Sequence, residues 1–217
     1  MSDIFNEVSE EVRREQFKKL WEKHGFLMLG AAFLVIAGVG GWRGYEWYQT
    51  RKAAEAGAAF QAAVTLSDQD KSAEAQASFA KIATESSRSY QMLARLREAS
   101  ELAKRDPQAA AKLYDSVAAD TTVAEPFRDS AILRSAALQL DTQSYADIRA
   151  KLAPLTAAGR AFRHSARELL ALSAWRAKDD AATREWLNAI ISDGESPTNL
   201  RSRAEALLAL LPPVAKG

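Results

Sequence analysis

An uncharged run at residues 25–42 constrains this chain of 217 residues more than any other feature. The run is GFLMLGAAFLVIAGVGGW, and as an α-helix it would be about 27 Å long, close to the hydrocarbon thickness of a bilayer. A core helix of a soluble protein is rarely so uniformly apolar. A cleaved signal peptide would have a shorter leader than the stretch 1–24 that stands before this run. The run therefore predicts one retained membrane-spanning helix.

Aromatic residues flank the run on both sides, as expected where a helix crosses the two membrane–water interfaces. Trp21 stands just before it. We therefore expect the membrane helix and its interfacial belt at residues 25–48. Four aromatic residues belong to the exit: Trp42, Tyr45, Trp47 and Tyr48.

Within comparable windows on its two sides, lysine and arginine are more numerous before the run than after it, and this bias favours a cytoplasmic N-terminus. In a bacterial inner membrane, residues 53–217 would then lie in the periplasm. The chain has no cysteine, which is compatible with that oxidising compartment. Five basic residues precede the run, namely Arg13, Arg14, Lys18, Lys19 and Lys23, and three follow it, namely Arg43, Arg51 and Lys52.

The segment before the run, residues 1–24, has apolar residues at helical spacing among Glu, Lys and Arg. Ile4, Val8 and Val12 lie at i, i+4 and i+8. This spacing predicts an amphipathic helix on the cytoplasmic side, which lies on the membrane surface or docks on a partner. A frayed tail is the alternative.

Small residues recur at four-residue spacing near the end of the run. Ala37 pairs with Gly41 in this pattern, and Gly40 pairs with Gly44. Such spacing lets two membrane helices approach closely, so these four residues are candidates for helix packing. Glycine is also common in membrane helices that make no such contact, and this alternative stays open.

Residues 53–217 are predicted to be almost entirely helical, because 41 of them are alanine, the strongest helix former. Large apolar residues recur there at nearly regular intervals of about 35 residues, close to the period of tetratricopeptide repeats. No helical hairpin of this kind can bury its apolar face alone, so stacking would bury the alanines against these landmarks. The landmarks are Phe79, Tyr114, Leu152 and Trp186.

Helix-terminating residues separate the predicted helices. Asp106-Pro107 places a cap and a first-turn proline before one helix, and Ser144 with Asp147 resembles a capping box. The pattern predicts an all-α solenoid of about four tetratricopeptide-like hairpins plus a C-terminal capping helix that starts near Pro197. A generic helical bundle is the alternative. Pro154 is expected to kink a helix.

The composition excludes most chemistry. Without cysteine there is no thiol nucleophile or Cys-based zinc site, and the formal charge of +1 argues against nucleic-acid binding. We expect His24 to be solvated at the membrane boundary and His164 to form a surface pair with Glu168. Asp179 and Asp180 fit helix caps. We therefore expect no enzyme, no catalytic residue, no metal, no cofactor and no small-molecule substrate.

Arginines recur at one position relative to three of the landmarks. Arg95 precedes Tyr114 by the same interval at which Arg167 precedes Trp186, and Arg134 stands one residue closer to Leu152. First helices line the concave groove of tetratricopeptide arrays, so these arginines are candidates for a partner-binding row of guanidinium groups. The alternative is a solvated face with local ion pairs.

The stretch EEVRREQFKKLWEKHG before a single span, the alanine-rich repeats and the closing SRAEALLALL resemble the ancillary subunit of the bacterial SecYEG translocon. The resemblance covers nearly the whole chain. It implies an N-in anchor, a periplasmic repeat domain, and association with the translocon channel and a periplasmic chaperone. It carries over no catalytic residue. Two other hypotheses stay open: a membrane-anchored scaffold for envelope assembly or cell division, and a membrane-bound enzyme.

Overall fold

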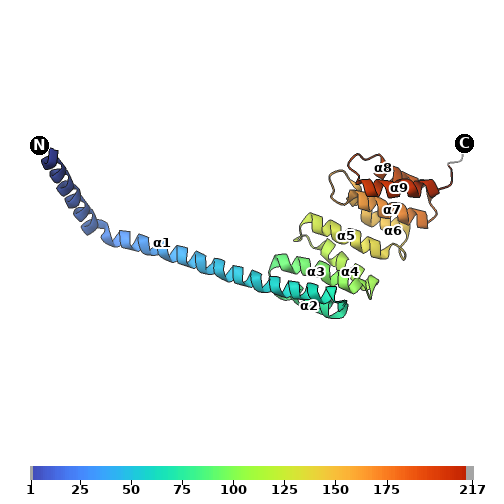
Figure 1. The fold of residues 1–217 in the computed structure, drawn as a ribbon, viewed down its shortest axis with the longest axis horizontal. Coiled ribbons are helices and arrows are strands. Elements are labelled where there is room, and N and C mark those ends of the chain that lie inside the picture. Colours follow the sequence, from blue (N-terminus) through green and yellow to red (C-terminus); the bar gives the residue numbers. More distant parts are fainter. Residues whose placement is uncertain (1, 214–217) are drawn as a thin grey trace. The chain divides into compact units, whose positions relative to one another are not determined.

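The computed structural model describes residues 2–213, and in this part of the chain helices are joined by turns and loops, without strands (Figure 1). Before Trp21, side chains are described only for Arg14 and Lys18, both exposed. The apolar side chains of the predicted amphipathic segment, among them Ile4, Val8 and Val12, lie outside the described side chains.

By its internal contacts the chain divides into two compact units, residues 1–54 and 55–217. Helix α1 (Ser2–Asp68) contributes to both. Its portion from Trp21 onward is long and apolar enough to cross a membrane, and almost none of the apolar window is buried. Phe26 is 90% exposed. This exposure contradicts a buried core helix. The predicted division into residues 1–24, 25–48 and 53–217 stays a prediction.

Residues 55–217 form four helical hairpins, α1/α2, α3/α4, α5/α6 and α7/α8, with α9 packed on the last (Figure 1). This arrangement confirms the all-α solenoid with a closing helix. The helices after α1 are α2 (Ser72–Glu85), α3 (Arg88–Ala103), α4 (Pro107–Ala119), α5 (Glu125–Gln139), α6 (Tyr145–Leu152), the 3₁₀-helix η1 (Ala153–Thr156), α7 (Arg163–Arg176), α8 (Asp180–Ile191) and α9 (Thr198–Leu210).

One rule builds all four apolar cores. In the first, Phe79 and Ile82 of the second helix α2 pack against Ala63 of α1 and Ala94 of α3. The second helix supplies large side chains to each core, and the helices on either side supply alanines that let the backbones approach. In the last two cores the flanking helices add leucines as well, Leu170 of α7 and Leu200 of α9. The rule explains the alanine content of the domain. The alanine pairs are Ala63 and Ala94, Ala99 and Ala131, Ala136 and Ala166, and Ala171 and Ala204.

The landmark residues occupy these cores. Phe79, Tyr114 and Leu152 are buried, at 0–2% exposure. Trp186 is only partly buried between the last two cores. Its indole N–H donates to the hydroxyl of Tyr145 at 2.9 Å, which connects the fourth hairpin to the third. A partly buried indole whose N–H is hydrogen-bonded is common, because this side chain has a single polar atom.

Side-chain caps begin the second helices of the last three hairpins, as predicted. Asp106 accepts a hydrogen bond from the backbone N–H of Ala109 at 2.9 Å, and Asp179 accepts one from Ala182 at 2.9 Å. Ser144 accepts from the N–H of Asp147 at 3.2 Å. Each cap satisfies one of the donors that a helix start leaves unpaired.

Pro154 does not kink a helix, so that prediction was wrong. Helix α6 ends at Leu152, and Pro154 lies in the first turn of η1. Proline lacks the N–H that an α-helix interior needs, but it fits the first turn of a new helical element. The chain therefore tightens into a 3₁₀ turn, which carries Leu155 into the third core.

Candidate protein-binding groove

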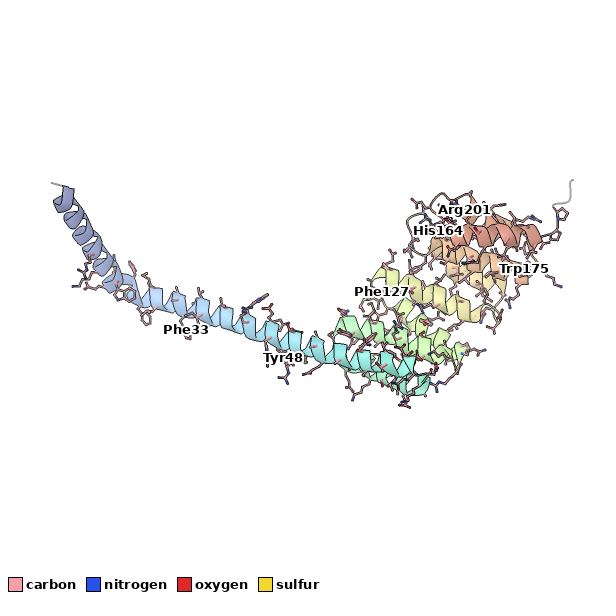
Figure 2. All side chains as sticks on the ribbon, viewed as in Figure 1. Phe33, Tyr48, Phe127, His164, Trp175 and Arg201 are labelled. Carbon is pink, nitrogen blue, oxygen red and sulfur yellow. The ribbon has the colours of Figure 1, made fainter. Side chains whose placement is uncertain are left out.

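The first helices of three hairpins carry a column of large apolar side chains that are exposed or partly buried. Phe60 of α1, Leu93 of α3 and Phe127 of α5 lie at almost equal intervals along the chain, close to the tetratricopeptide repeat length. Phe60 is partly buried, while Leu93 and Phe127 are each 37% exposed. Figure 2 labels Phe127 near the start of α5. We call Phe60, Leu93 and Phe127 the apolar column.

Two hollows lie beside the apolar column; each is lined by residues of both α3 and α5, and Phe127 lines both. The first has a volume of about 440 Å³ and the second about 590 Å³. We call the two together the α3/α5 groove. The first hollow is lined by the apolar column with Leu96, Arg97, Ser100, Ser130 and Arg134. The second is lined by Arg88, Met92, Arg95, Asp120, Val123 and Phe127, among others.

Three exposed arginines of the groove have no hydrogen bond or ion pair with the residues that the structure describes. They are Arg88, Arg97 and Arg134. The first hollow is lined by no carboxylate. The only carboxylate lining the second hollow, that of Asp120, lies 2.7 Å from the guanidinium of Arg95. The groove therefore combines apolar surface with uncompensated positive charge.

The three arginines predicted as one row have different surroundings. Arg95 pairs with Asp120 and donates to the carbonyl of Ser116 at 3.2 Å. Hydrogen bonds from Thr122 and Arg95 lower the pKa of Asp120 to about 2, so this carboxylate is charged at neutral pH. Arg95 is thus held within its own hairpin, although it lines the groove.

Arg167 is held still more firmly. Its guanidinium pairs with Asp193 at 2.9 Å and donates to the carbonyls of Ala189 at 3.0 Å and Thr156 at 3.1 Å. Its side chain is 15% exposed. Among the three arginines only Arg134 is exposed and unpaired in the groove, so the structure does not place them as one equivalent row. A partner-binding role for these residues stays a prediction.

Comparison with families of known proteins decides what kind of array this is. The model of the tetratricopeptide repeat-like domain matches residues 18–185. The chain belongs to this family. No curated protein and no solved structure matches the chain significantly. The repeats of a tetratricopeptide repeat-like domain indicate a scaffold for protein–protein interaction, and first helices of such repeats provide the groove described above.

His164 of the tetratricopeptide repeat-like domain is buried, so the prediction of a surface pair with Glu168 was wrong. Its Nδ1 lies 3.0 Å from the hydroxyl of Ser196, while Nε2 has no hydrogen-bond partner among the described residues. Burial and the neighbouring Arg163 lower the pKa of His164, against an opposing effect of Asp193. Glu168 instead receives two hydrogen bonds from Arg203, at 2.8 and 3.0 Å.

The loop after α8 gathers the polar groups around His164. Asp193 accepts a hydrogen bond from Arg163 at 3.2 Å. Hydrogen bonds from Arg163, from the backbone N–H of Glu195 and from Arg167 hold the pKa of Asp193 far below its usual value. Arg201 of α9 donates to the carbonyl of Asp193 at 3.0 Å. Figure 2 shows His164 and Arg201 together near the C-terminal end of the domain. The cluster fastens α7, α8 and α9 to one another.

The other polar residues considered for catalysis or metal binding cap helices or link neighbouring hairpins. Asp179 caps α8, and Asp180 lies in its first turn. Lys151 of α6 contacts Asp115, Ser135 and Gln139, which links the second and third hairpins. Among the residues that the structure describes, no three acidic or histidine side chains are grouped closely enough to hold a metal ion. His24 is exposed, as predicted.

The small residues predicted to pack membrane helices are all exposed in residues 1–54. A side chain added at Gly40, Gly41 or Gly44 would meet open space. Ala37 is exposed as well. Their surface is therefore accessible to another helix, and their packing role stays a prediction. The apolar column, Arg88 and Arg97, in contrast, were missed from the sequence, although the nearly regular spacing of the three large apolar residues was visible there. Of the three unpaired arginines, Arg134 was among the predicted groove residues.

Proposed function

We propose that this chain is a non-enzymatic, membrane-anchored scaffold that binds protein partners at the SecYEG translocon. In this role it assists protein export or handover to a periplasmic chaperone. One observation carries the proposal: a tetratricopeptide repeat-like domain with an open groove shares its chain with one helix long and apolar enough to cross a membrane. The translocon as the site of action is supported by the resemblance of the N-terminal stretch and the overall layout to the ancillary SecYEG subunit.

The proposed location is the bacterial inner membrane, with the N-terminus in the cytoplasm and the repeats in the periplasm. The excess of basic residues before the span supports this orientation. Contacts after the span suit a membrane interface: Arg51 lies over the ring of Trp47 at 5.5 Å, and Lys52 over that of Tyr48 at 4.8 Å. Such pairs place an aromatic ring and a cation together at headgroup depth.

The orientation can be tested cleanly because the natural chain has no cysteine. Single variants Ser9→Cys and Ser202→Cys mark the two sides of the span, and Ser202 is exposed. We expect a membrane-impermeant maleimide to label Ser202→Cys in spheroplasts, and Ser9→Cys only after lysis. Labelling of Ser9→Cys alone in intact spheroplasts would overturn the orientation.

The partners can be tested by site-specific photo-crosslinking in membranes. A photoreactive residue at Val39, which is 59% exposed in the span, should crosslink to a subunit of the translocon channel. One at Ser89, which lines the groove, should crosslink to a periplasmic chaperone. Crosslinks only to envelope-assembly or division proteins would support the alternative scaffold and overturn the translocon role.

A further inference from the structure

The α3/α5 groove has the same chemical order along both of its first helices. On α3, Leu93 is followed by Arg97 one helical turn later, a rise of about 6 Å. On α5, Phe127 is followed by Arg134 two helical turns later, a rise of about 10 Å. First helices of successive hairpins run in the same direction, so the apolar end and the basic end coincide on both.

Several arginines elsewhere in the repeats pair with carboxylates, unlike Arg97 and Arg134 of the groove. Arg160 contacts Glu125 and Asp129, Arg163 contacts Asp193, and Arg203 contacts Glu168. Arg97 and Arg134 face a hollow without a carboxylate. The domain has equal numbers of basic and acidic residues, 21 of each, so this positive site reflects local placement rather than composition.

We propose that the α3/α5 groove binds a short segment of a partner protein that combines one large apolar side chain with carboxylates. The apolar side chain packs on Leu93 and Phe127, and the carboxylates pair with Arg97 and Arg134. Because an extended chain advances about 3.3 Å per residue, the carboxylates stand two or three residues from the apolar anchor. This inference rests on the proposed scaffold function and names the chemistry of the partner.

The size and polarity of the groove set the strength of this binding. Arg97 and Arg134 are exposed, and ion pairs at exposed positions contribute little and are screened by salt. The two hollows accommodate a few side chains rather than a domain. The bound segment is therefore held weakly and exchanges quickly, as suits a scaffold that passes partners on.

Peptide binding to the purified full chain in detergent micelles tests the inference. The probe is a short fluorescein-labelled peptide that contains one Phe with Asp at the second and third positions after it. Anisotropy should show saturable binding that weakens as NaCl rises. Arg97→Glu and Arg134→Glu should each weaken it about fivefold to tenfold, whereas Arg149→Glu, at an exposed arginine of α6 outside the groove, should change it less than about twofold.

Two further peptides separate a built site from general attraction. Replacing both Asp by Asn, or Phe by Ala, should each remove most of the binding. Equal binding of the peptide that lacks Phe, equal weakening by Arg149→Glu, or no binding of the first peptide would overturn the inference. If chains with Arg97→Glu or Arg134→Glu still form the crosslinks from Val39 and Ser89 in membranes, the scaffold function is retained without peptide binding in this groove. If peptides bind but no protein crosslinks, the groove stands without the scaffold function.

Discussion

Arg95 and Arg167 make matching contacts in the second and fourth hairpins. Each guanidinium, on a first helix, donates to a carbonyl near the end of the second helix of the same hairpin and pairs with the aspartate after it. The equal spacing of Arg95 and Arg167 from their landmarks therefore corresponds to equivalent contacts that join the two helices within each hairpin.

Arg167→Ala should lower the free energy of unfolding by about 2 kcal/mol, because it leaves two partly buried carbonyls and Asp193 with fewer donors. Arg167→Lys should recover little of this loss, since one ammonium group cannot replace a planar fork. Urea unfolding followed by circular dichroism measures the change. The matched control Arg149→Ala, at an exposed and unpaired site, should stay within about 0.5 kcal/mol of the wild type.

His164 should make the stability of the repeats depend on pH in the mildly acidic range. Burial and Arg163 lower its pKa below the usual 6.5, so the folded state binds fewer protons than the unfolded state. The stability that depends on neutral His164 is therefore fully present above the pKa of the unfolded state. It is lost as pH falls from that pKa towards the lower pKa of the folded state.

Unfolding midpoints between about pH 7.5 and pH 5.5 should consequently fall more for the wild type than for His164→Asn, which keeps an acceptor near Ser196 but does not titrate. Asp193 acts in a separate range, because its pKa is held far below 3.8, and its contribution is lost only as pH falls below that value. Parallel pH profiles for the wild type and the variant would show that His164 does not cause the pH dependence of stability.

The closing helix should stabilise the repeats through two leucines. Leu200 and Leu211, which are 6% and 8% exposed, pack with Leu187 and Ile190. Leu200→Ala and Leu211→Ala should each cost about 2–4 kcal/mol. Leu210→Ala is the matched control, because Leu210 is 70% exposed. The thermal midpoint of this variant should stay near that of the wild type.

The small residues of the span give a fourth prediction. Gly40→Leu combined with Gly44→Leu should abolish helix contacts that require close approach, since each leucine projects from an open glycine surface. The photo-crosslink from Val39 measures the loss. Gly30→Leu adds one leucine at an equally open glycine outside the four-residue pattern and should preserve the crosslink. Equal crosslinking in both variants would show that glycine is incidental here.

Local signals in the sequence were sufficient for the hairpins and their caps. Asp106, Ser144 and Asp179 act on donors three positions further along the chain, so their patterns are visible in sequence. The burial of His164 was not, because the residue that contacts it, Ser196, comes from the loop after the next helix, α8.

The three arginines of the predicted row have different contacts, and their spacing offers a geometric reason. Arg134 stands one position closer to its landmark than Arg95 and Arg167 stand to theirs, and one residue rotates a side chain by about 100° around a helix. Counting back from the second helices therefore mixed two faces of the first helices. Counting from one first helix to the next would have found the apolar column.

Helix α1 runs without interruption from Ser2 to Asp68, and this continuity has a consequence for cooperativity. Starting a helix is the costly step, with a statistical weight of about 10⁻³, while each later residue is added at little cost. In the whole chain, the part of α1 that covers Phe79 extends a helix already begun in the apolar run. In a fragment starting at residue 53 it must nucleate anew. Lipid or a partner that favours a helical anchor would thereby tighten the first hairpin without touching it, and a loosened first hairpin would act back on the anchor by the same free energy.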